Sequence, residues 1–253
     1  MPNAKDLQPD RITSLIIGPG KSGKTYAMRT WAKLGPMMVF NFDGGIAALA
    51  GEDADYEVFM DADRYKPSAY TNFVKRWDEV MDEMRTGKKQ YKTLALDGLT
   101  FLSRWTMNHN QYLNRTIDKP PGYEGYRMLK DKIRDVIMKA KVVGVHIVAT
   151  VNDTIDKDET TGEISRNPDI EGSYRGEIAT DFDFVVYSKV GRDVRDPKKP
   201  KYYWQTVPDH QIKSAGLRWE CGLLPEEEPD FNVVLRKIEA RYPHVKQEVI
   251  HAR

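Results

Sequence analysis

The sequence predicts an α/β fold in which a mostly parallel sheet is flanked by helices. Short apolar runs, each followed by Gly, Asp or Asn, are typical of buried strands that end at loops. They occupy residues 12–17, 37–42, 93–96 and 145–151. Segments with helical apolar spacing lie between and around them, at residues 24–34, 68–85, 99–114 and 126–142. Strands that alternate with helices favour a parallel sheet covered on both faces.

The pattern changes after residue 151. Residues 153–180 are polar and rich in Gly, Asp and Thr, so we expect a long segment that is either kept for a function or mobile. Two strand-like runs, 182–190 and 201–207, flank the segment GRDVRDPKKP and predict a C-terminal β-hairpin with a basic tip. Beyond Asp230, apolar side chains share one helical face and predict a closing helix. They are Phe231, Val234, Leu235 and Ile238.

Length and composition indicate a globular chain. The 253 residues are 40% hydrophobic and 30% charged, and we expect a single domain with a core at about 12–207 and an extension at about 208–253. The net charge of +1 gives no bulk attraction to nucleic acid or anionic membranes. Cys221 is the only cysteine, which excludes internal disulfides and multi-cysteine zinc sites. Without a signal peptide or an apolar stretch of about 20 residues, we expect a cytoplasmic protein with no membrane partner.

The segment GPGKSGKT matches the phosphate-binding (Walker A) pattern G-x-x-x-x-G-K-[ST] and lies between a predicted strand and a predicted helix. In this arrangement backbone N–H groups surround a phosphate, Lys24 reaches the β- and γ-phosphates, and the Thr25 hydroxyl binds Mg²⁺. A glycine-rich turn without a ligand is the alternative. The predicted nucleotide-binding residues are Gly18, Pro19, Gly20, Lys21, Ser22, Gly23, Lys24, Thr25 and Tyr26.

Three polar residues follow the other predicted strands. Asp97, after TLAL, is a candidate for holding Mg²⁺ through water, although it could instead cap the next helix. Asp43, after VFNF, is a candidate for orienting the attacking water, or else a turn residue. Asn152 could sense the γ-phosphate or occupy a turn. The segment NDTI at 152–155 does not match the guanine-reading N-K-x-D pattern, so ATP with Mg²⁺ is the expected cofactor pair.

The order GPGKSGKT, VFNFDGG, TLALD and HIVATVND resembles the core of RecA-type recombination ATPases, most closely the short single-domain RecA-like ATPases of bacteriophages. The resemblance covers residues 12–190. It implies a RecA-like P-loop NTPase core, with Asp43 as the catalytic carboxylate where the family usually has Glu. It also implies that Asn152 links the γ-phosphate to a DNA-binding loop.

The same resemblance bears on assembly. The segment YYWQTVPDHQIKSAGLRW is similar to stretches in which a Lys and an Arg reach the ATP of a neighbouring subunit. Lys213 and Arg218 are the corresponding residues here, with ordinary surface charges as the alternative. The resemblance therefore implies self-assembly into a ring or filament, a phage single-strand-binding protein as a partner, and the cytoplasm of an infected bacterial host.

Candidate contacts to single-stranded DNA lie in two loops. The first, between the third and fourth predicted helices, mixes cations and aromatic rings suited to phosphate contact and base stacking, although it could be an ordinary Pro-Gly turn with surface tyrosines. The second follows Asn152 and is acidic, with Arg175 in its latter part. The basic tip of the C-terminal hairpin is a third candidate, or simply a soluble turn. The named DNA-binding candidates are Arg115, Lys119, Tyr123, Arg127 and Arg175.

These observations favour an ATP-hydrolysing protein that acts on single-stranded DNA in phage recombination, annealing or repair. A nucleotide-gated scaffold or loader for DNA replication or packaging is one alternative. A small-molecule P-loop kinase is another, although such kinases usually have an arginine-rich lid, and the segment 153–171 is acidic.

Overall fold

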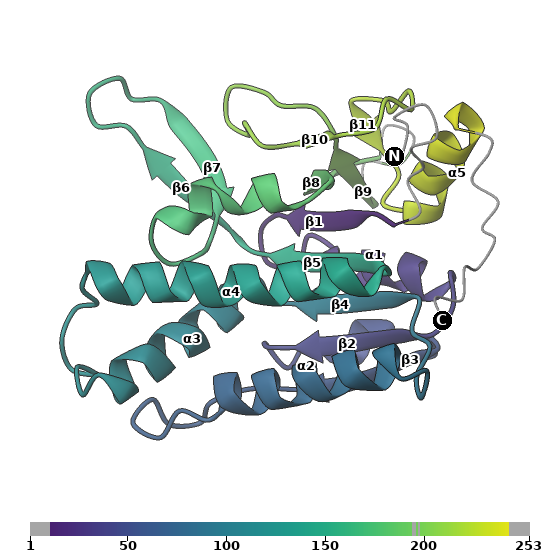
Figure 1. Ribbon diagram of the computed structural model, residues 1–253. Helices are drawn as coiled ribbons and strands as arrows, with labels where there is room; N and C mark the ends of the chain where they lie inside the picture. Colours follow the sequence, from purple (N-terminus) through teal and green to yellow (C-terminus); the bar gives the residue numbers. More distant parts are fainter. Residues whose placement is uncertain (1–10, 194–195, 197, 243–253) are drawn as a thin grey trace, which may run out of the picture.

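The computed structural model describes residues 11–193, 196 and 198–242. Its centre is a mixed sheet with the strand order β11-β9-β8-β1-β5-β4-β2-β3, and β10 pairs with β8 (Figure 1). The strands are β1 (Thr13–Ile17), β2 (Met37–Asn41), β3 (Ala54–Val58), β4 (Thr93–Asp97), β5 (His146–Val151), β8 (Phe184–Arg192), β9 (Pro200–Gln205), β10 (Gly216–Leu217) and β11 (Glu226–Glu227).

Six neighbouring strands, from β8 through β1, β5, β4 and β2 to β3, run parallel. Their carboxyl ends therefore meet at one edge of the sheet, on the left in Figure 1. The parallel part of the predicted fold is confirmed. In such sheets ligands bind in the crevice outside the carboxyl ends of the strands, so this edge is where the site is expected.

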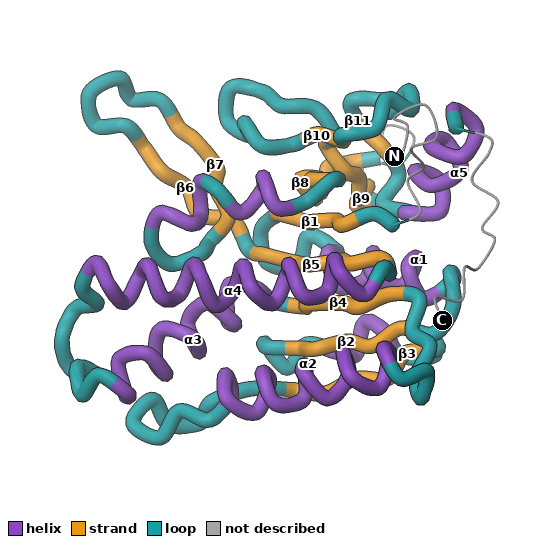
Figure 2. Tube along the Cα trace, viewed as in Figure 1, coloured by secondary structure: helices purple, strands orange, loops and turns teal. Residues whose placement is uncertain are grey.

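Helices cover both faces of the sheet because side chains alternate along each strand. On one face, Leu15 of β1 and Phe40 of β2 pack in the core beneath α2 (Ala69–Arg85), α3 (Leu99–Leu113) and α4 (Tyr123–Val143). On the other face, Ile16 and Val39 pack against α1 (Lys24–Ala32) and α5 (Phe231–Arg241). Figure 2 shows these two helical layers. No helix among the described residues is long and apolar enough to cross a membrane.

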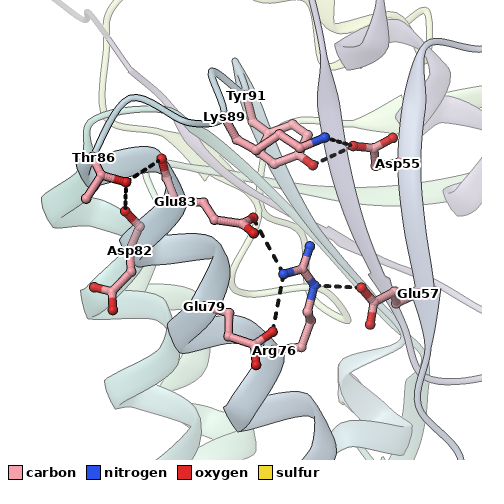
Figure 3. Close-up of polar contacts among 9 residues, drawn as sticks. All are labelled: Asp55, Glu57, Arg76, Glu79, Asp82, Glu83, Thr86, Lys89 and Tyr91. Carbon is pink, nitrogen blue, oxygen red and sulfur yellow. Dashed lines mark hydrogen bonds and ion pairs between the residues drawn. The ribbon is translucent and has the colours of Figure 1, made fainter.

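Strand β3, at the edge of the sheet, was not predicted because its residues ADYEV lack an apolar run and are at most half-buried. Side-chain contacts from α2 and the following turn hold it (Figure 3). Arg76 of α2 donates to Glu57 at 2.6 Å. Lys89 and the Tyr91 hydroxyl donate to Asp55 at 3.0 and 2.5 Å. These contacts lower the pKa of Asp55, chiefly through the hydrogen bond from Tyr91.

The polar segment 153–180 contains regular structure that its sequence does not predict. Strands β6 (Asp153–Lys157) and β7 (Ile164–Pro168) form an antiparallel hairpin of their own. Two short 3-10 helices follow, η3 (Ser173–Gly176) and η4 (Ile178–Asp181). The hairpin escapes prediction because polar residues, most of them partly buried, dominate both strands and leave no apolar run. In Figure 1 it projects from the carboxyl edge of the main sheet.

The C-terminal hairpin and the closing helix are confirmed. Strands β8 and β9 pair antiparallel, although Arg195 in the basic tip lies outside the described residues. Helix α5 docks on α1, where the Phe231 ring stacks on Trp31 with centroids 4.3 Å apart. The Phe231 amide donates to Thr30 Oγ1 at 3.1 Å, and Asp230 caps the helix by accepting from the Asn232 amide. The extension thus braces the helix that follows the phosphate-binding motif.

Phe231→Ala should lower the free energy of unfolding by about 3–5 kcal/mol, because it opens a cavity beside Trp31 in a site with no exposure. Urea denaturation measures the change. Tyr123→Ala, at a ring that is 84% exposed, is the control and should shift stability by less than about 0.5 kcal/mol. Equal effects of the two substitutions would contradict a structural role for α5.

Candidate functional site

The phosphate-binding motif connects β1 to α1 at the carboxyl edge of the sheet. Its loop needs glycine at two positions. A Cβ on Gly18 would lie 2.6 Å from the Ser188 carbonyl oxygen, and Gly23 has a φ of +87° with the Tyr202 ring 3.1 Å from its Cβ position. The main chain therefore turns tightly between neighbouring strands before α1 begins, which leaves backbone N–H groups free to surround an anion.

Lys24 is held at the centre of this loop. Its ammonium donates to the carbonyl oxygens of Gly18 and Pro19 at 2.8 Å and to Asn152 Oδ1 at 3.0 Å. The residue is only 9% exposed. Burial lowers the Lys24 pKa to about 8, against the opposing pull of nearby carboxylates, Asp153 foremost. At neutral pH the buried ammonium of Lys24 is therefore positively charged and donates its hydrogen bonds to neutral oxygens. A phosphate oxygen can replace these acceptors.

Asp97 ends β4 and is buried beside the loop. Its Oδ1 accepts from Thr150 Oγ1 at 2.6 Å and from Thr25 Oγ1 at 3.2 Å. Its Oδ2 accepts from Asn41 Nδ2 at 3.1 Å. Burial raises the Asp97 pKa, and the hydrogen bonds from Thr150, Asn41 and Thr25 oppose that rise. The contact between Thr25 and Asp97 brings together the two residues predicted for Mg²⁺.

Asp43 lies at the end of β2, and Asn41 joins it to Asp97. The Asn41 amide donates to Asp43 Oδ1 at 3.0 Å as well as to Asp97, while its own oxygen accepts from the Gly44 amide. Asp43 is exposed, and its Oδ1 also accepts from the Gly45 amide at 2.7 Å. Sequence reasoning missed Asn41. The sequence does contain a signal for it: Asn41 is the one polar residue in the apolar run 37–42, and a buried polar side chain needs a hydrogen-bond partner.

Asn152 and Asp153 connect the loop to the β6–β7 hairpin. Asn152, at the end of β5, contacts Lys24, and its own amide donates to Thr100 Oγ1 at 3.0 Å. The next residue, Asp153, begins β6 and forms an ion pair with Arg166 of β7 at 2.7 Å. The Tyr187 hydroxyl also donates to Asp153. Asp153 was not among the predicted residues, although it is the charge that most opposes the lowered pKa of Lys24.

A magnesium ion fits the oxygen atoms at this edge. The described residues contain no cluster of three or more His, Cys, Asp or Glu side chains suited to a metal ion. Mg²⁺ nevertheless binds in phosphate sites through one or two protein oxygens, together with waters and substrate phosphates. Thr25 Oγ1 and the Asp97 carboxylate supply such a pair of oxygens on adjacent elements.

Lys213 and Arg218 lie away from the loop of their own chain. Lys213 forms an exposed ion pair with Glu163 at 3.0 Å, beside the β6–β7 hairpin. Arg218 contacts Asp183 at 3.1 Å and the Thr180 carbonyl oxygen at 2.5 Å. Asp183 immediately precedes β8, so Arg218 lies at the amino edge of the sheet, opposite the loop. A contact of either residue with nucleotide would have to be made to a neighbouring protomer, and it stays a prediction.

Four of the predicted DNA-binding residues lie in or next to the turn between α3 and α4, which extends past the carboxyl ends of the strands (Figure 1), and the fifth, Arg175, lies in η3. Arg115, Lys119 and Tyr123 are exposed. Arg127 forms an ion pair with Glu124 at 2.6 Å, and Arg175 with Asp156 at 3.3 Å. Arg115 and Lys119 therefore form no ion pair among the described residues, whereas Arg127 and Arg175 would each need to exchange a carboxylate for a DNA phosphate.

The two candidate DNA loops meet in space. The Tyr126 ring lies 2.7 Å from the Cβ position of Gly172, which joins the start of α4 to the segment after β7. A groove of about 410 Å³ lies between them. Its lining includes the cationic side chains of Arg64, Arg104 and Lys119 and the rings of Trp105 and Tyr126. Sequence reasoning did not select Arg64 or Arg104, which come from the segment before α2 and from α3.

The loop, the lysine and the paired Thr25 and Asp97 define a P-loop nucleotide-binding protein of the α/β class. A family model described as an AAA domain matches residues 10–215. The chain belongs to this family, and it is a P-loop NTPase of the AAA type. No curated protein matches it.

The pKa of Lys24 predicts how nucleotide binding depends on pH. Lys24 has a pKa of about 8 in the free protein, and contact with a phosphate raises it. ADP affinity should therefore fall above pH 8, by up to about tenfold per pH unit, and binding at pH 8.5 should take up a proton. Calorimetry in two buffers of different ionisation enthalpy measures both effects.

The range from pH 7.5 to 9.5 avoids titration of the phosphate itself, whose last pKa is about 6. Lys24→Arg is the matched control, because a guanidinium stays charged throughout this range. Its binding should be weaker at pH 7.5 but independent of pH. A fall above pH 8 that persists in Lys24→Arg would assign the effect to another group.

Proposed function

We propose that this P-loop NTPase binds and hydrolyses ATP with Mg²⁺ and acts as an assembly on single-stranded DNA. The observation that carries the first part is that Lys24 is held in the loop at the edge of the sheet where hydrogen bonds also connect Thr25 to Asp97 and, through Asn41, Asp97 to Asp43. Mg²⁺ would neutralise charge on the β- and γ-phosphates. The protein's part is to position groups around those phosphates.

Each residue has a distinct task in this proposal. Lys24 exchanges the carbonyl oxygens of the loop for phosphate oxygens and stabilises charge on the β- and γ-phosphates. Thr25 and Asp97 offer oxygens to the ion. Asp43 is the only exposed carboxylate of this group, since Asp97 is buried with both oxygens accepting hydrogen bonds. Its Oδ2 is left to orient the attacking water, because the hydrogen bonds from Asn41 and Gly45 both go to Oδ1.

The surface between α3, α4 and the segment after β7 supports the DNA part. Its groove combines guanidinium and ammonium groups with aromatic rings, the combination used to bind single strands without sequence preference. The groove lies near the turn between α3 and α4, which extends past the carboxyl edge of the sheet where the phosphate loop lies. With a net charge of only +1, each protomer would bind weakly, and assembly would supply affinity through repeated contacts.

Asp43→Asn should retain nucleotide binding and slow hydrolysis by about 10²-fold or more, the usual effect of losing a general base. The amide keeps the hydrogen bond from Gly45, so the turn should survive. Steady-state turnover and ADP affinity are measured together. Lys24→Ala is the comparison and should lose both binding and turnover. Unchanged turnover in Lys24→Ala would refute the phosphate site, and equal losses of binding and turnover in Asp43→Asn would make Asp43 structural.

Assembly makes a separate prediction. If Lys213 or Arg218 reaches the γ-phosphate of a neighbouring protomer, ATP turnover should rise more than linearly with protein concentration, and single-stranded DNA should stimulate it. ATPase rates and light scattering across protein concentrations test this. If the protein stays a monomer, ATP turnover rises linearly with protein concentration and DNA has no effect, the assembly on DNA is refuted. The kinase and scaffold functions would then be the remaining candidates.

The DNA contact has its own control. Arg115→Ala with Lys119→Ala should reduce the slope of log affinity against log salt by about 1.4, at roughly 0.7 for each single-strand phosphate contact. Arg85→Ala with Lys88→Ala removes the same charge from the last residue of α2 and the turn after it, at the amino edge of the sheet. That pair should leave the slope unchanged. Equal slopes in the two double variants would exclude the α3–α4 turn as a DNA contact.

A further inference from the structure

A cavity of about 720 Å³ opens beside the phosphate loop, on the face of the sheet that α1 covers. The loop residues Ser22 and Gly23 form one end of it. The first turns of α1 form a second wall, with Tyr26 and Thr30, and Tyr202 of β9 faces them. Its volume is in the range of small-molecule sites, about 300–1,000 Å³.

The cavity shares its loop end with the phosphate site. Ser22 and Gly23 belong to both, and Tyr26 directly follows the metal-binding candidate Thr25. A nucleotide whose β-phosphate contacts Lys24 has its α-phosphate at the start of α1, because the helix amides there are the next free donors. The cavity beside the loop and the first turns of α1 is then the adjoining space that can hold its ribose and base.

Two tyrosines offer ring surface to the cavity. Tyr26 is 63% exposed and Tyr202 44% exposed, so both rings have surface open to a ligand. The Arg29 guanidinium lies over the Tyr26 ring, 5.1 Å from its centroid, which supports that ring from its own helix. The Tyr202 ring rests on the backbone of Gly23, 3.1 Å from the Cβ position, so it is fixed against the loop itself.

We propose that this cavity holds the purine base of the bound nucleotide, with Tyr202 as the residue that the base packs against. The inference rests on the proposed nucleotide site and adds to it the part that recognises the nucleoside. The chain lacks the N-K-x-D pattern for base reading. Packing on an aromatic ring gives affinity to any base and most to the larger purine rings. The C-terminal extension also contributes, since Glu228, Pro229 and Asp230 close the far wall.

The proposal assigns the phosphates and the base of the nucleotide to different residues, so the experiment measures their binding separately. Calorimetry with Mg²⁺ compares ADP, UDP and tripolyphosphate, which lacks a nucleoside. Tyr202→Ala should weaken ADP binding by about tenfold, in keeping with stacking energies of about 1–3 kcal/mol per base. It should leave tripolyphosphate within about twofold and reduce the preference for ADP over UDP. Tyr202→Phe keeps the ring and should bind ADP as the unsubstituted chain does.

Tyr203→Ala is the matched control, because Tyr203 is the next residue of β9 and does not line the cavity. It should change none of the three affinities. ADP binding that is unchanged in Tyr202→Ala, or tripolyphosphate binding that falls as much as ADP binding, would overturn the base site while leaving the phosphate site intact. Binding of neither ADP nor tripolyphosphate by the unsubstituted chain would instead refute the proposed function, and the base site with it.

Discussion

The structure depends on the placement of one buried cation. Lys24 is 9% exposed and is held by two backbone carbonyl oxygens of its own loop and by Asn152 Oδ1 from β5. Burying an ammonium is costly unless its charge is compensated, and here the compensation comes from neutral oxygens in contact and carboxylates farther away. That arrangement is only possible because parallel strands deliver their carboxyl ends to one edge. The same arrangement prepares the loop to exchange neutral oxygens for phosphate.

The two carboxylates at this edge, Asp97 and Asp43, differ in burial and in hydrogen bonding. Asp97 is buried, and Thr150, Thr25 and Asn41 donate to it, so its position is set from three elements. Asp43 is exposed and receives hydrogen bonds on Oδ1. A single amide, Asn41, contacts both carboxylates and keeps them apart. In the proposed function the buried Asp97 holds the ion, and the exposed Asp43, which water can reach, orients the attacking water, although both are aspartates at the ends of apolar strands.

The phosphate loop has contacts on two sides. Through Asn152 and Asp153 the loop meets the β6–β7 hairpin, whose two strands are joined by the ion pair between Asp153 and Arg166. Through Gly23 it meets Tyr202 and the C-terminal extension. The first direction leads towards the groove proposed for DNA, and the second towards the cavity proposed for the base. If Lys24 turned to a phosphate, Asn152 would lose the hydrogen bond from Lys24. Asn152 directly precedes β6, so this change would occur next to the hairpin.

The sequence by itself determined the parallel sheet, its two helical layers, the phosphate loop and the strand-end positions of Asp43, Asp97 and Asn152. Local apolar periodicity and the Walker A spacing carry that information, because buried strands and phosphate loops constrain neighbouring residues in the chain. Only the tertiary structure decided the edge strand β3, the β6–β7 hairpin and the partners Asn41 and Asp153. These strands are rich in polar residues and have no apolar run to reveal them. Long-range hydrogen bonds, such as that from Asn41 to Asp97, depend on strand order, which no local pattern encodes.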